Sequence, residues 1–241
     1  MGSHERGFTI IEVLLFLAIS GLMLAAAIMG VTANINNSRF NDGLRSTESY
    51  LQREYNEVAS GVNDRDEALA CDAFGQITTG GPSNPTKSPG MTNCVILGRF
   101  IKLGGSKLTS RYIIGYGATG KGDDTTAIRA MNPVVAPTIA YEGTYDVPGG
   151  IDIVNTTLPS STSAISDLAI IKSPASGIIL YYMKAGTASS GIDNSFINLI
   201  NLNKNAKICL SDGQRNGRIN MLSNGRGQEV IQADLATSGA C

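Results

Sequence analysis

The feature that most constrains this chain is an apolar run from Phe8 to Val31, in which only Thr9, Glu12 and Ser20 are polar. As a helix rising about 1.5 Å per residue, the run would span roughly 36 Å, which is enough to cross a bilayer. Glu12 interrupts the run near its start, and a carboxylate in hydrocarbon is costly and usually functional. The run therefore predicts a membrane-spanning helix with one functional charge.

An ordinary secretory signal does not account for this run. Only seven residues precede it, and no small-residue cleavage site follows it. Arg6 lies before the run, whereas Arg39 and Arg45 lie after it, so the basic residues orient the segment only weakly. We expect the segment to stay in the protein as an anchor.

The helical pattern continues beyond the anchor. Side chains suited to burial recur at spacings of four and three residues, which is the stripe of an amphipathic helix: they are Phe40, Leu44, Thr47, Leu51, Tyr55, Val58 and Val62. The other face is polar and carries Asp42, Arg45, Glu48, Gln52, Arg53 and Glu57. Glycines should weaken or bend the helix locally at Gly21, Gly30 and Gly43. We expect one helix over residues 8–62, with a transmembrane half, 8–31, and an amphipathic half, 32–62, packed on a globular body.

Residues 63–241 have the pattern of a β-rich head. Turn residues separate short β-like runs, namely CVILGRFI, RYIIGY, IDIVN, LAIIK, GIILYYM, FINLINL, AKICL, RINML and EVIQADL. Such runs predict antiparallel sheets. The stretch Gly75–Asn93 is rich in Gly, Pro, Ser and Thr and predicts an exposed loop. The fold class is therefore α+β, with a long N-terminal helix packed on an antiparallel β-sheet head.

Four cysteines lie in the head, at Cys71, Cys94, Cys209 and Cys241. An even number behind a membrane segment favours two disulfides in an oxidising compartment. Three pairings are open, and we favour the two that are local in sequence, Cys71 with Cys94 and Cys209 with Cys241. No CxxC pair occurs and the single histidine is His4, so we expect no metal site and no cofactor.

Residue patterns for catalysis are weak. A Ser-His-Asp or Cys-His system would have to use His4, which lies before the apolar run. The stretch Gly115–Gly120, GYGATG, formally matches GxGxxG, but the residues before Pro133 are too few and too poor in apolar periodicity for the helix of a dinucleotide site. A Gly-rich surface loop is the better interpretation, and we expect the protein not to be an enzyme.

The start of the chain resembles a known class of signal. A short leader ends in Gly7 and is followed by Phe8, Thr9 and, at fixed spacing, Glu12, within R-G-F-T-I-I-E-V-L-L. This resembles the class III signal of type IV pilins and type II secretion pseudopilins. The leader differs in having Glu5 next to Arg6, which makes it less basic than many.

The resemblance implies a maturation and assembly pathway. Prepilin peptidase would remove the leader, residues 1–7, by cutting between Gly7 and Phe8, and would methylate the new N-terminus of Phe8. The partners implied are this peptidase, other pilin subunits and an inner-membrane assembly platform. The implied location is the bacterial cytoplasmic membrane, with a single span, and afterwards the periplasm or a pilus on the cell surface.

The resemblance also suggests a role for Glu12. Cleavage would leave a positive amine on Phe8, and in a bundle of like helices the Glu12 carboxylate of one subunit could pair with the Phe8 amine of a neighbour. Each charge is costly when buried alone, so the pair would set the axial register of the subunits. The alternative is that Glu12 extends to the interface from the end of an ordinary anchor.

Three functions remain open at this point. The first is a structural subunit of a pilus-like filament, for which the long, loop-rich head favours a minor pilin. The second is a type II secretion pseudopilin, which has the same anchor. The third is a DNA-binding minor pilin, because the C-terminal hairpins resemble the GspH and FimT branch and would place Arg215, Arg218 and Arg226 near phosphates. Ordinary turn charge is the simpler interpretation of these arginines.

Overall fold

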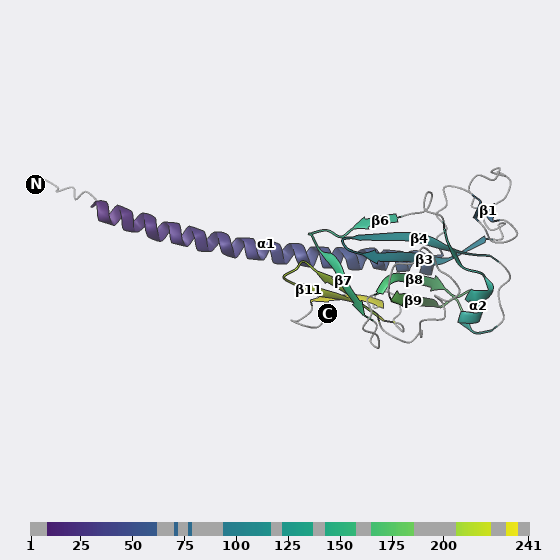
Figure 1. Ribbon diagram of the computed structural model, residues 1–241. Coiled ribbons are helices and arrows are strands. Elements are labelled where there is room, and N and C mark those ends of the chain that lie inside the picture. Colours follow the sequence, from purple (N-terminus) through teal and green to yellow (C-terminus); the bar gives the residue numbers. More distant parts are fainter. Residues whose placement is uncertain are drawn as a thin grey trace, which may run out of the picture.

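A computed structural model describes residues 9–61, 70–71, 77–78, 94–116, 122–136, 143–157, 165–185, 206–222 and 230–235. Within these residues, a single long helix, α1, projects from a β-rich head that packs along its C-terminal half (Figure 1). The predicted α+β class, with a long N-terminal helix and antiparallel sheets, is confirmed.

Helix α1 runs without interruption from Ile10 to Ser60, through all three glycines of this stretch. It begins after Thr9, whose side chain accepts a hydrogen bond from the Glu12 amide, as N-cap residues do. It ends before residue 62 because Gly61 adopts a left-handed conformation, with φ of 66°, and donates its N–H to the carbonyls of Glu57 and Val58. The helix is thus delimited by local caps at both ends.

The larger sheet of the head has strand order β5-β4-β3-β8-β9, and β6 pairs with β4 beside β5. Its centre is the long hairpin of β3, Cys94–Gly104, and β4, Lys107–Tyr116. The remaining strands are β5 (Val134–Val135), β6 (Gly143–Asp146), β8 (Ile165–Lys172) and β9 (Ile179–Ala185). Every pair in this sheet is antiparallel.

A second sheet has strand order β12-β11-β10-β7 and is also antiparallel. Its strands are β7 (Asp152–Thr157), β10 (Ala206–Ser211), β11 (Asn216–Met221) and β12 (Ile231–Leu235). The bridge between Gly105 and Ile153 connects the two sheets. The runs AKICL, RINML and EVIQADL, which the sequence predicts as strands, correspond to β10, β11 and β12.

Some expectations need correction. Ile77–Thr78 lies in the predicted exposed loop but forms β2, which pairs with β1, Ala70–Cys71. A short helix not predicted from the sequence, α2, spans Asp124–Ala130 and begins at the N-cap Asp123. Gly115 belongs to β4 rather than to a surface loop, and a side chain there would meet Leu97. The other expected strands agree in position, except that FINLINL lies outside the described residues.

Two apolar clusters make up the core of the part of the chain that the structure describes. The larger lies between α1 and both sheets and includes Phe40, Leu44, Leu51, Ile101 and Ile219. The smaller lies on the opposite face of the larger sheet, where Phe100, Ile171 and Tyr182 pack with Ile128 and Met131 from α2 and the residue after it. The C-terminal half of α1 is therefore part of the main core of the head.

Candidate assembly site

The projecting part of α1, residues 10–31, is exposed on all sides among the residues that the structure describes. Every residue from 9 to 39 is exposed, and the large apolar side chains among them include Ile10, Leu14, Phe16, Leu22 and Met29. The helix is long and apolar enough to cross a membrane. An exposed apolar surface of this size indicates contact with lipid or with other proteins.

Glu12 lies in the first turn of this exposed segment. No other charged residue occurs between Phe8 and Arg39, so Glu12 is the only charge on the apolar half of the helix. Its backbone N–H is 3.3 Å from the Thr9 hydroxyl, and a carboxylate in a first turn also interacts favourably with the helix dipole. The side chain is therefore accessible to a neighbouring molecule. Gly7 and Phe8 lie outside the described residues, so the pairing of Glu12 with an amine stays a prediction.

The second half of α1 is attached to the head along the predicted stripe. Phe40, Leu44, Leu51, Tyr55 and Val58 are all buried, and so is Thr47. Val62 lies outside the described residues. Burial extends further round the helix than the spacing predicted, because Gly43, Tyr50 and Glu54 are buried as well.

A buried group of charges joins this half of α1 to β3. The Arg99 guanidinium from β3 lies between two carboxylates of α1, with Nε 3.4 Å from Glu54 Oε2 and Nη2 in contact with Glu57 Oε2. Arg99 also lies over the ring of Tyr112, 3.8 Å from its centroid, and donates to the Tyr112 hydroxyl. From the outer face of the helix, Arg53 donates to Glu54 at 3.3 Å. Two arginines thus neutralise two carboxylates.

Glu54 is the most enclosed member of this charge cluster, with only 2% of its surface exposed. Burial raises the pKa of Glu54 above its usual value, and the nearby Arg99 opposes that shift. Among the described residues, neither Glu54 Oε2 nor Arg99 Nε has a hydrogen-bond partner, although the two atoms form an ion pair. Sequence reasoning missed both residues. Two features of the sequence could have indicated them. Arg99 is a charged residue within the apolar run CVILGRFI, and Glu54 lies three residues after Leu51 and so falls on the buried stripe.

Polar contacts add to the attachment at several points along α1. Near the place where the helix leaves the head, Arg215 donates to Asn37 at 2.7 Å and its guanidinium lies over Phe40. Farther along, Tyr145 donates to Ser46 and stacks on Tyr50. At the C-terminal end, a Lys172 ammonium donates to the Ala59 carbonyl, which is one of the otherwise unsatisfied carbonyls of the last turn.

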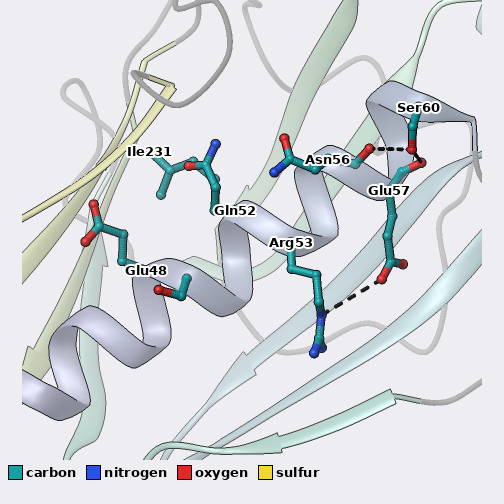
Figure 2. A pocket seen from close by; sticks show the side chains of 8 residues that line it. Glu48, Gln52, Arg53, Asn56, Glu57, Ser60 and Ile231 are labelled. Carbon is teal, nitrogen blue, oxygen red and sulfur yellow. Dashed lines mark hydrogen bonds and ion pairs between the residues drawn. The ribbon is translucent and has the colours of Figure 1, made fainter.

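The outward face of the attached half borders a shallow groove (Figure 2). Its lining is mostly polar and comprises Glu48, Ser49, Gln52, Arg53, Asn56, Glu57, Ser60 and Ile231. Arg53 extends along the helix toward Glu57, at 3.9 Å, while Glu48 accepts a hydrogen bond from the Ala233 amide of the edge strand β12. The helix thus provides a hydrogen-bond acceptor for one backbone N–H of the sheet edge, which would otherwise be open to pairing with another strand.

The described arginines among the candidate phosphate-binding residues lie beside carboxylates. Arg215 pairs with Asp212 at 2.8 Å, and Arg218 lies 3.7 Å from Asp234. Arg226 lies outside the described residues. Each described arginine of this set therefore has a carboxylate next to it, which reduces the positive charge available to a phosphate.

The cysteines are only partly described. Cys209 is fully buried in β10 and is disulfide-bonded. Cys71 and Cys94 lie in β1 and β3, where the backbone alone is described, and Cys241 lies outside the described residues. Both favoured pairings, Cys71–Cys94 and Cys209–Cys241, stay predictions.

Comparison with known proteins bears on the N-terminal segment. Residues 2–28 match a family model described as the prokaryotic N-terminal methylation motif. No curated protein and no solved structure matches the chain. The match spans the leader, the Gly7–Phe8 junction, Glu12 and most of the exposed apolar helix. The chain therefore carries the class III signal peptide of type IV pilins and pseudopilins, as its opening residues predict.

Proposed function

We propose that this protein is a structural subunit, of the minor pilin class, in a type IV pilus-like filament. Prepilin peptidase cuts between Gly7 and Phe8, the exposed half of α1 anchors the subunit in the inner membrane, and the same half then packs against its counterparts in the filament. The observation that carries this proposal is the fully exposed apolar segment, residues 10–31, which lies within and just beyond the methylation motif.

The architecture supports an assembly role in a second way. The charged and aromatic contacts hold the other half of α1 to the head, so the helix and the head form one rigid connection. In such a subunit, the position of the helix in an assembly determines the position of the head. That property suits a filament in which helices form the centre and heads the outside.

The first experiment tests processing and export. We would measure the intact mass and the N-terminal peptide of the full chain from membrane and sheared-surface fractions, in cells with active or inactive prepilin peptidase. The expected result is a chain that begins at methylated Phe8 and enters the sheared fraction only with the active peptidase. A chain that begins at Met1 and stays in the membrane would overturn the proposal.

The second experiment tests Glu12. The Glu12→Val variant should insert into the membrane normally but enter filaments poorly, because the Phe8 amine of its neighbour would lose its partner. Ser20→Val is the matched control, since it also replaces an exposed polar residue of the same segment. Equal filament yield from both variants would contradict the proposed role of Glu12.

A type II secretion pseudopilin has the same anchor, so these residues do not distinguish it from a pilin. The kind of filament that it forms does. A short periplasmic filament, together with loss of exported proteins when the gene is deleted, would favour that alternative over a surface pilus.

For a DNA-binding pilin, replacing Arg215, Arg218 and Arg226 with glutamine should lower salt-sensitive DNA binding by the full chain. The ion pairs at Arg215 and Arg218 make this the less favoured function.

A further inference from the structure

The apolar contacts of α1 do not by themselves define where along its axis the head is attached. Hydrophobic contact is non-directional, and the stripe repeats at nearly constant spacing. A displacement of α1 by four residues brings Phe40 to the position of Leu44, and Leu51 to the position of Tyr55. Both changes place a large apolar side chain where another one was.

Glu54 is different, because it is the only charged residue among the buried positions of α1. Its partner, Arg99, is fixed by the ladder of β3, where Arg99 lies opposite Tyr112 on one side and Ile170 on the other. A displacement of one helical turn moves the carboxylate by about 5.4 Å. Arg99 and Glu54 would then both be enclosed without each other, which is costly for each charge.

The geometry of the pair favours specificity over stability. Buried ion pairs repay the cost of their desolvation only with good geometry and complete hydrogen bonding. Here Arg99 Nε and Glu54 Oε2 are 3.4 Å apart, and neither has a hydrogen-bond partner within the described part of the chain. Such a pair contributes little net stability in the native register, but it penalises a displacement of four residues, which brings no carboxylate to either position beside Arg99.

We propose that the Glu54–Arg99 pair determines the axial register of α1 on the head. Glu54 and Arg99 are positioning residues, because they act by placing the exposed half of the helix at one height relative to the sheets. This inference concerns the fold of a single subunit, so it stands or falls separately from the proposed filament function.

Gly43 restricts the register from another position. A Cβ atom at Gly43 would lie 2.6 Å from the Pro148 carbonyl oxygen and 2.5 Å from the end of Ile151. Displacement by one turn would bring Arg39 or Thr47 to this place. The contact is steric and lies eleven residues, about 16 Å, from Glu54 along the helix. It favours the native register in any variant in which the charges alone are removed.

The test removes both charges together and measures the register directly. The full-length chain in detergent micelles would carry Glu54→Leu with Arg99→Met, and spin labels at the exposed positions Asn56 and Lys107. Lys107 pairs with Asp146, next to the Tyr145 that contacts Ser46, so the two labels are offset along the helix axis. The remaining carboxylate, Glu57, is about one-third exposed and can be solvated.

The parent chain should give one narrow distance. The double variant should unfold cooperatively and show a second, minor distance, changed by up to about 5 Å, as expected for a shift of one turn. Arg45→Met, which removes an exposed arginine from an ion pair on the same helix, should give the parent distance alone.

Two results would overturn the proposal. A single unchanged distance in the double variant would mean that Gly43 and the apolar contacts suffice. The second result is loss of cooperative unfolding both in this variant and in another apolar version, Glu54→Met with Arg99→Leu. It would show that the pair is needed for stability rather than for register.

Discussion

The two halves of α1 share one continuous backbone but have opposite surroundings. Residues 10–31 are exposed on all sides, whereas from Phe40 to Val58 one side is buried against the two sheets. The first half is apolar around its whole circumference, and the second half is apolar on one stripe. A helix that is apolar all round requires lipid or other helices. Among the described residues, the half of α1 that has no partner in the subunit is therefore the half available to partners outside it.

Charge differs between the halves in the same way. The exposed apolar half carries Glu12 alone, while the attached half carries several charged residues that are paired with each other or with the head. Buried charge in the attached half is neutralised within one subunit. We expect the charge of the exposed half to be neutralised only between subunits.

The largest effect should come from breaking the buried pair on one side. Arg99→Met leaves Glu54 enclosed with only the exposed Arg53 beside it, which should lower the free energy of unfolding of the head by up to about 3–5 kcal/mol. Urea unfolding of the full chain in micelles, followed by near-ultraviolet circular dichroism, measures this change. Arg45→Met is the surface control and should have no measurable effect. A loss for Arg99→Met below about 1 kcal/mol would show that Glu54 is not enclosed as described.

A pair of leucines compares the two halves directly. Leu51→Ala removes a fully buried side chain and should lower the free energy of unfolding by about 2–5 kcal/mol. Leu17→Ala makes the same chemical change at a side chain that is 60% exposed, so it should leave unfolding of the head unchanged. The same urea titration measures both variants. Equal losses would mean that the exposed half contacts the head.

Gly43 tests how closely the attached half approaches the head. The added methyl group of Gly43→Ala would meet the Pro148 carbonyl and should cost about 1–3 kcal/mol, as overpacking does. Gly30→Ala is the control in the exposed half, where nothing lies within 4 Å of the added carbon. It should leave the head unchanged and favour the helix slightly. Thermal unfolding of both variants in micelles would distinguish these outcomes, and a neutral Gly43→Ala would contradict the close approach.

The smallest effect concerns pH. Burial raises the pKa of Glu54, so the folded chain holds this proton more tightly than the unfolded chain does. The stability gained from proton binding is complete below the unfolded pKa, near 4.5, and is lost as the pH rises through the higher folded value. The free energy of unfolding of the parent, relative to Glu54→Gln, should therefore decrease as the pH is raised above 4.5. Parallel pH curves for the two proteins would contradict the direction of this shift.

Much of the fold could be predicted because its signals are local. The apolar run, the stripe on α1 and the runs that became β3, β4, β8, β10 and β11 depend on spacing within a few residues. Two of the short elements, β5 and β6, were missed because two to four residues carry too little periodicity, and both form by pairing with β4. The end of α1 at Ser60 depended on the conformation of Gly61.

The candidate site divides in the same manner. The leader junction and Glu12 are recognisable from the residues alone, since the motif is a contiguous pattern at the start of the chain. The apolar stripe that attaches the helix was recognisable, but its charged contacts were not. The sequence placed Glu57 and Arg53 on a solvated face, whereas the structure brings Glu57 to Arg99 and Arg53 to Glu54. The sequence also indicated three arginines as a basic group, whereas Asp212 and Asp234 pair with two of them.

The sequence by itself determined that this chain has an apolar helix long enough to span a membrane, a class III signal and a β-rich head. Those properties follow from hydropathy, local periodicity and one contiguous motif. Only the tertiary structure decided which strands the stripe of α1 meets, that Glu54 is enclosed with Arg99, and that residues 10–31 are left exposed. The physical reason is that pairing and burial depend on residues far apart in the chain. Local spacing does not indicate which distant residues will meet.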